Sequence, residues 1–80
     1  MTVYICLSEE GVRQTRARGF DAQRDVLVLA HDAVYSTESG AHVRVCRDDL
    51  RVRGLPGSDG HIDDNALMKL ILENDRIVVA

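Results

Sequence analysis

The sequence predicts a small α/β domain, a three-layer α/β/α arrangement with a mainly parallel sheet of about four to five strands. Strand-like and helix-like segments alternate along its 80 residues, which is typical of a parallel sheet covered by helices. Residues 26–30 (VLVLA) are continuously aliphatic, as in a parallel strand buried on both faces. Residues 67–72 carry the apolar stripe of an amphipathic helix. We therefore expect one domain over residues 1–80.

The first element is a strand over residues 2–7 (TVYICL), which are rich in β-branched and aromatic side chains. Ser8 is a good helix N-cap, and acidic residues follow it where the first turn of a helix favours them. We expect a helix over residues 9–18 that ends at Gly19.

The middle of the chain predicts a short turn and a third strand. Residues 33–35 follow the aliphatic strand and suit a short helical turn. Residues 42–46 (HVRVC) then alternate, so Val43 and Val45 should share one face of a strand. Three polar or reactive residues share the other face: His42, Arg44 and Cys46. This alternation indicates a strand near a sheet edge or a subunit interface.

The last part predicts two helices, a loop and a strand. Residues 47–53 should form a short helix, and a loop rich in glycine and proline follows over residues 54–60. Either Asp63 or its neighbour Asp64 caps a final helix that runs to Asn74, which is suited to a left-handed terminator. Residues 76–79 (RIVV) are the closing strand.

The composition excludes several classes of function. The net charge is −3, and ten basic residues are mixed with thirteen acidic ones, so we expect no direct nucleic-acid binding. The longest apolar run is too short to cross a membrane, and the N-terminus carries no signal peptide pattern. Two cysteines forty residues apart do not make a disulfide framework. These features predict a cytoplasmic protein.

We expect neither a metal nor a cofactor. The three histidines and two cysteines lack the spacing of metal ligands. Gly54, Gly57 and Gly60 are spaced three apart but follow a predicted helix instead of a strand, so they match no nucleotide-binding fingerprint.

Cys46 is the strongest candidate for chemistry, because it lies where a strand turns into a helix. In a parallel sheet, ligands collect at the carboxyl ends of the strands. The amides at a helix start lower the pKa of a thiol, and Arg44 and Arg47 would add to that effect. Asp48 and Asp49 would oppose it. The alternative is that Cys46 is a small apolar residue that fills a gap.

Two further residues bear on this site. His31 follows the second strand and could activate Cys46 as the imidazole of a thiol–imidazole pair, or it could simply hydrogen-bond within its loop. Cys6 lies inside the first strand, and we expect it to be a core residue.

Three segments of the chain resemble a known family, the DsrE/DsrF/DsrH proteins, which include TusB, TusC and TusD. Residues 31–35 (HDAVY) are similar to the "DGVY"-type segment after the second strand of that family. Residues 43–46 (VRVC), followed by Leu50 and residues 53–55 (RGL), resemble its strand–helix–"RG" element. Residues 67–78 resemble its closing helix and "DRVV" strand. The resemblance covers essentially the whole chain, in order.

This resemblance implies a parallel α/β sheet, an oligomer of related small subunits, and a role in sulfur transfer. In the DsrE/TusD type, a cysteine at the end of this strand accepts a persulfide, and Cys46 matches that position. The length of the chain is closest to the DsrH/TusB type, which generally lacks this cysteine and is often a structural subunit. The DsrH-type cysteine lies in the first helix, where this chain has none.

The leading hypothesis is therefore a small sulfur-carrier or sulfurtransferase subunit. Cys46 would hold persulfide sulfur between a donor and an acceptor protein, in 2-thiouridine synthesis for tRNA or in sulfur oxidation. Arg44 and Arg47 would stabilise the anionic persulfide, with His31 as a helper. The alternative is a non-catalytic structural subunit of a DsrEFH/TusBCD-like complex. A third hypothesis is that the chain is a small-ligand-binding module.

Overall fold

A computed structural model describes residues 1–57 and 60–80. The chain forms one five-stranded sheet in the order β4-β3-β2-β1-β5, and every neighbouring pair is parallel. The strands are β1 (Thr2–Cys6), β2 (Val26–Leu29), β3 (Val43–Cys46), β4 (His61–Ile62) and β5 (Arg76–Val79). The predicted fold class is confirmed.

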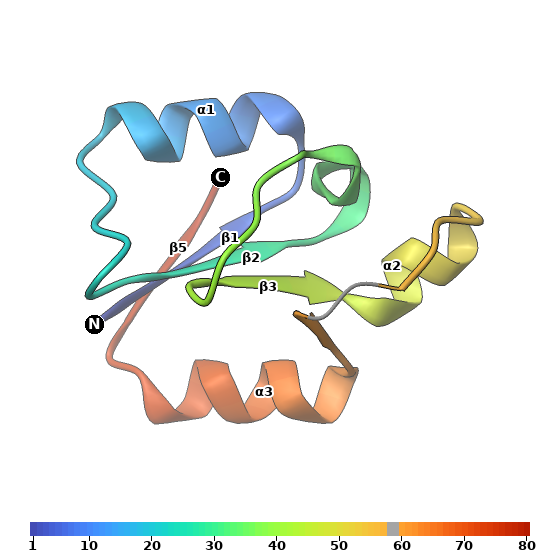
Figure 1. The fold of residues 1–80 in the computed structure, drawn as a ribbon. Helices are drawn as coiled ribbons and strands as arrows, with labels where there is room; N and C mark the ends of the chain where they lie inside the picture. Colours follow the sequence, from blue (N-terminus) through green and yellow to red (C-terminus); the bar gives the residue numbers. More distant parts are fainter. Residues whose placement is uncertain (58–59) are drawn as a thin grey trace.

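Helices cover both faces of the sheet, so the architecture has three layers (Figure 1). On one face lie α1 (Glu9–Ala17) and a short 3₁₀ helix, η1 (His31–Tyr35). On the opposite face lies α3 (Asp64–Glu73), while α2 (Arg47–Val52) extends beyond the end of β3.

Two apolar clusters lie on the two sides of the sheet. The larger one joins α1, η1 and α2 to the sheet, and its buried members are Cys6, Val12, Leu27, Leu29, Ala33, Val34, Val43, Val45 and Leu50. The smaller one lies under α3, and its buried members are Val3, Val28, Ala30 and Cys46. The side under α3 is thin, because no side chain of α3 itself is fully buried.

The predicted helix starts are confirmed in atomic detail. The hydroxyl of Ser8 accepts a hydrogen bond from the N–H of Gly11, at 3.1 Å, and so satisfies a free amide of the first turn of α1. Asp63, the first of the two candidates, caps α3 by accepting from the N–H of Ala66 at 2.8 Å. Gly19 follows α1 with a φ of +93°, a left-handed conformation that favours glycine.

One element was missed and one local prediction is wrong. The segment before α3 contains β4, a strand of two residues that the glycine-rich pattern did not indicate. It begins after Gly60, where a Cβ would come 2.8 Å from the carbonyl oxygen of Val43, so only glycine allows this approach to β3. Asn74 is extended, with φ −121° and ψ 140°, because its side-chain amide donates to the carbonyl of Leu70 at 2.7 Å and ends the helix that way.

Candidate functional site

Cys46 ends β3 at the carboxyl edge of the sheet, beside the end of β4. The two strands are in register there, with Cys46 opposite Ile62. After β3 the chain enters α2, whose Leu50 packs in the cluster on the α1 side. After β4 it enters α3, which packs on the other side. Cys46 therefore lies at the carboxyl ends of the parallel strands, where α/β folds commonly place a site.

The side chain of Cys46 is nevertheless part of the core. Only 8% of the residue is exposed, and it packs under α3 with Val3, Val28 and Ala30. Leu67 and Leu70 of α3 cover the same cluster. Cys46 is the N-cap residue of α2, but its thiol makes no capping hydrogen bond. The thiol therefore lacks the partial exposure that is typical of a reactive cysteine.

The surroundings of Cys46 disfavour a thiolate. Burial is the largest cause, followed in order by the carboxylates of Asp49, Asp64 and Asp48, and together they raise the pKa of the Cys46 thiol to about 11. The sequence predicted the opposite direction, because it indicated a helix start and two flanking arginines. The physical cause is that the thiol faces the apolar interior, and the charged groups that act on it most strongly are carboxylates.

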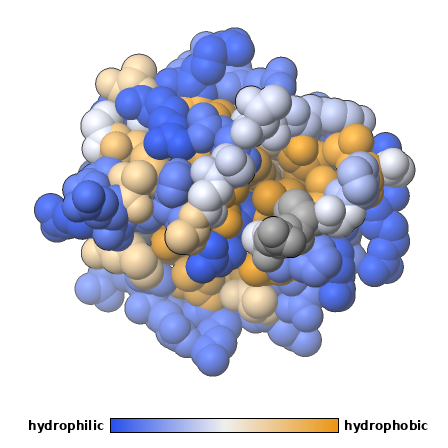
Figure 2. All heavy atoms as spheres, viewed as in Figure 1, coloured by the Kyte–Doolittle hydropathy of each residue, from blue (hydrophilic) through white to orange (hydrophobic). Residues whose placement is uncertain are grey.

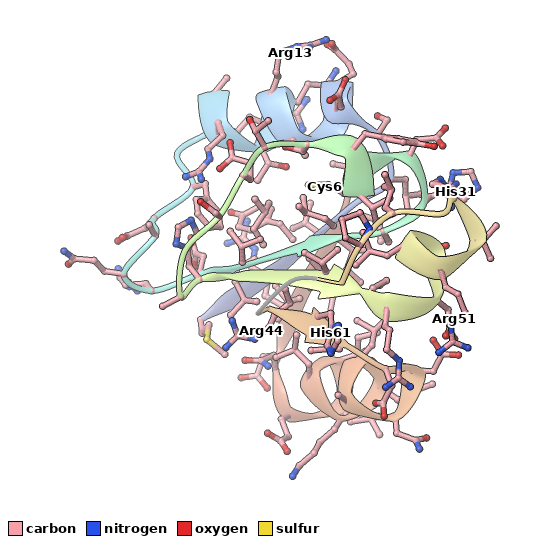
Figure 3. The ribbon with its side chains drawn as sticks, turned by 45° about the vertical axis from the view of Figure 1, so that its right-hand side comes forward. Cys6, Arg13, His31, Arg44, Arg51 and His61 are labelled. Atoms are coloured by element: carbon pink, nitrogen blue, oxygen red, sulfur yellow. The ribbon has the colours of Figure 1, made fainter. Side chains whose placement is uncertain are left out.

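The two arginines do not form an anion site around the thiol. The guanidinium of Arg44 donates to the carbonyl oxygens of Ala41 and Val43, at 2.7 and 3.0 Å. It therefore lies toward the amino end of β3, away from the carboxyl edge (Figure 3). Arg47 is exposed at the first position of α2. The geometry of these two residues does not support the predicted stabilisation of a persulfide anion.

His31 lies at the carboxyl edge of the sheet but does not pair with Cys46. Its side chain is 67% exposed, and its Nδ1 lies 3.8 Å from a carboxylate oxygen of Asp32. Its backbone has a φ of +53°, in the left-handed region, and its N–H donates to the carboxylate of Asp49 at 2.9 Å. An exposed ring cannot hold a hydrogen bond to a buried thiol, so the geometry does not support activation of Cys46.

Sequence reasoning missed an ion-pair cluster beside His31. Arg53 of the α2 C-cap is mostly buried, and its Nη2 lies 3.1 Å from Oδ1 of Asp32. Its Nη1 also lies 3.6 Å from the carboxylate of Asp49, one helical turn earlier. The cluster joins η1 to α2. The spacing of Asp49 and Arg53 was the available signal, since residues four apart meet on a helix.

Cys6 is confirmed as a core residue. It is fully buried, its sulfur lies 3.5 Å from the hydroxyl of Thr15, and burial raises the pKa of its thiol. His42 is placed differently from the prediction. Its Nε2 lies 3.2 Å from the guanidinium of Arg16, and its ring lies 5.6 Å from that of Phe20, so it belongs to the α1 side and not to the side of Cys46.

Two open cavities lie near the outer side of β3, of about 500 and 320 Å³, and both are lined by Glu38 and Val45. Apolar residues gather on the right of Figure 2. Leu55 and Pro56 are among the residues that line the smaller cavity. Cys46 lines neither of them. The thiol therefore does not open into either cavity.

Comparison with known proteins gives no identification. No protein-family model matches the chain, and no curated protein matches it significantly. Within residues 1–57 and 60–80, three or more His, Cys, Asp or Glu side chains never gather as a group that could hold a metal ion. None of the helices in those residues has the length and apolar character needed to cross a membrane.

Proposed function

We propose that this chain is a non-catalytic structural subunit of a cytoplasmic sulfur-relay assembly of the DsrE/DsrF/DsrH type. The observation that carries the proposal is the burial of Cys46 together with the acidic groups around it. The resemblance in three segments along the chain supports the family.

The thiolate population supports a structural role for Cys46. A thiol with a pKa of about 11 is ionised in about one molecule in ten thousand at pH 7. A cysteine at the reference value of 9.0 would be ionised in about one in a hundred. Because the thiolate is the nucleophile that attacks a donor persulfide, this small thiolate population disfavours reaction of Cys46 in the folded subunit.

Surface features support a role in assembly. A domain of this size buries a thin core, and association with other subunits compensates for that. Several large apolar side chains remain exposed outside α2, α3 and β5, among them Leu7 and Tyr35. Such residues suit contacts with related small subunits, and those subunits would carry the sulfur between donor and acceptor proteins.

The experiment is a transfer assay on the complex purified from the native cells with a tagged chain. We expect related small subunits in fixed stoichiometry, and we expect Cys46→Ala complexes to transfer sulfur as fast as the wild type. Cys6→Ala is the matched control, because it also removes a buried thiol. Loss of transfer in Cys46→Ala, with assembly and the control intact, would contradict the proposal.

A second candidate function is the sulfur carrier itself. It is favoured by one observation, the position of Cys46 at the carboxyl ends of the parallel strands. For this function, docking of a donor would have to move the start of α3 away from the thiol, because Leu67 covers the cluster that contains Cys46. The transfer assay distinguishes the two candidates, since a carrier loses all transfer in Cys46→Ala.

A further inference from the structure

The two edges of the sheet are finished differently. At one edge, β4 adds only two residues, and Arg44 folds its guanidinium onto the carbonyl of Val43 next to it. At the other edge, β5 runs beside β1, and none of the described residues pairs with its outer side. Short strands and charged side chains protect a sheet edge from association. The apolar stretch Ile77–Val79 of β5 has neither protection.

The backbone of β5 offers hydrogen-bonding groups outward. Ala80 donates its N–H to the carbonyl of Ile5 at 2.8 Å and accepts from the N–H of Leu7 at 2.9 Å, so its groups face β1. Because these groups alternate in direction along a strand, those of Val78 also face β1. The N–H and C=O groups of Ile77 and Val79 therefore point away from the sheet.

Apolar side chains flank this open edge. Val79 is 62% exposed although it belongs to the sheet. On α3, Leu67 and Leu70 pack against the sheet, whereas Met68 and Leu72 are 57% and 77% exposed. Met68 and Leu72 lie one helical turn apart on α3. Met68 directly follows the packed Leu67, so the two exposed side chains lie on the next side of the helix, about a quarter turn around its axis.

The direction of winding places Met68 and Leu72 toward β5. In a right-handed crossover, the residue that comes directly after a buried helix residue lies on the side of the helix that faces the next strand of the chain. The crossover through α1 shows the same geometry, because Arg16 follows the buried Thr15 and pairs with Glu38, on the side of the later strands. By this rule, the exposed side of α3 lies beside the open edge.

We propose that β5 is the interface between two copies of this chain, which pair antiparallel about a two-fold axis at Val78. In this register Ile77 exchanges an N–H···O=C pair with Val79 of the partner subunit, and Val78 lies opposite its own copy. The two sheets then form one continuous sheet. The inference is independent of any role in sulfur transfer.

Charge selects this arrangement over the alternatives. The apolar end of β5 is preceded by Asp75 and Arg76. Parallel addition of a second β5 would place each of these charges beside its own copy, which destabilises a strand pair. Antiparallel pairing centred on Ile77 would place Arg76 opposite Val78. The two-fold at Val78 places all three apolar residues opposite apolar residues, with Arg76 opposite Ala80.

The first test is the mass of the chain by sedimentation equilibrium over a range of concentrations. We expect a dimer, and we expect Val79→Lys to raise its dissociation constant at least about tenfold, because it places two lysines at the shared edge. Val52→Lys is the matched control, since Val52 is more exposed and lies on α2. A monomer at every concentration would overturn the proposal, as would a dimer that Val79→Lys leaves unchanged.

A second test reads the register and does not depend on the lysine variant. Opposite residues in a non-hydrogen-bonded antiparallel pair have Cα atoms about 4.5 Å apart, within reach of a disulfide. We expect Val78→Cys to give a covalent dimer on mild oxidation, while Arg76→Cys stays mostly monomeric. The native thiols, Cys6 and Cys46, are buried and do not interfere. Faster cross-linking of Arg76→Cys than of Val78→Cys would overturn the proposed register.

Discussion

The neutral state of Cys46 is the central property of the candidate site at the scale of single residues. Val3, Val28 and Ala30 surround the residue, and the ionisable groups that act on its thiol most strongly are carboxylates. Ionising this thiol would bury a charge near like charges. The start of a helix would lower the pKa of an exposed cysteine, but the cysteine at the start of α2 is buried and protonated.

This property predicts a loss of stability at alkaline pH. The folded chain binds the proton of Cys46 more tightly than the unfolded chain, so its contribution is complete below pH 9.0 and is lost as the pH rises to about 11. The difference corresponds to about 2–3 kcal/mol in the free energy of unfolding. Urea unfolding between pH 8 and pH 11 (roughly the window set by these values) measures it.

The control for this prediction is Cys46→Ala, which should lose less stability over that window than the wild type. The pKa of Cys6 is raised too, so Cys6→Ala removes a separate part of the same pH dependence. An equal loss of stability in the wild type and in Cys46→Ala would contradict the assignment to Cys46.

His31 holds a left-handed backbone that costs energy for any residue with a Cβ. Its φ is +53°, and its ring is mostly exposed. We expect His31→Gly to raise the free energy of unfolding by about 0.5–1 kcal/mol, while His31→Ala does not raise it. Thermal unfolding measures both. If His31→Gly is less stable than His31→Ala, the ring makes contacts that outweigh the backbone strain.

At the scale of elements, the capping residues determine where the helices begin. Asp63 supplies an acceptor to the first turn of α3, while the neighbouring Asp64 is the first residue inside the helix. We expect Asp63→Ala to lower the free energy of unfolding by about 1 kcal/mol, through loss of this cap. Asp64→Ala should have a smaller effect, and equal effects of the two substitutions would contradict the assignment of the cap.

The elements also show what could be predicted from sequence. The strands and helices with a strong local pattern were found, since β2 is aliphatic throughout and α3 carries an apolar stripe. β4 was missed because its pairing depends on Gly60, which lets the chain approach β3, and no local pattern reports such a contact. The direction of the Cys46 side chain followed from the alternation of β3, but its cover by α3 did not, because that cover comes from residues far along the chain.

At the scale of the whole molecule, the chain is a sheet with one well-covered side and one thin side. The cluster beneath α1, η1 and α2 has more buried residues than the cluster under α3. The thin side and the open β5 edge lie next to each other, so a second copy at β5 would extend the sheet where cover is least. The ion pairs of Arg53 with Asp32 and Asp49 join η1 to α2 at the carboxyl edge of the sheet.

The most direct test of a structural Cys46 is mass spectrometry of the folded chain after incubation with a cysteine desulfurase and cysteine. We expect no added mass of one sulfur atom on Cys46 of the folded chain, because the folded thiol is buried and neutral. Cys6 serves as an internal reference, since it is fully buried. A persulfide that forms on Cys46 of the folded chain, while Cys6 stays unmodified, would contradict the account and make this chain a sulfur carrier.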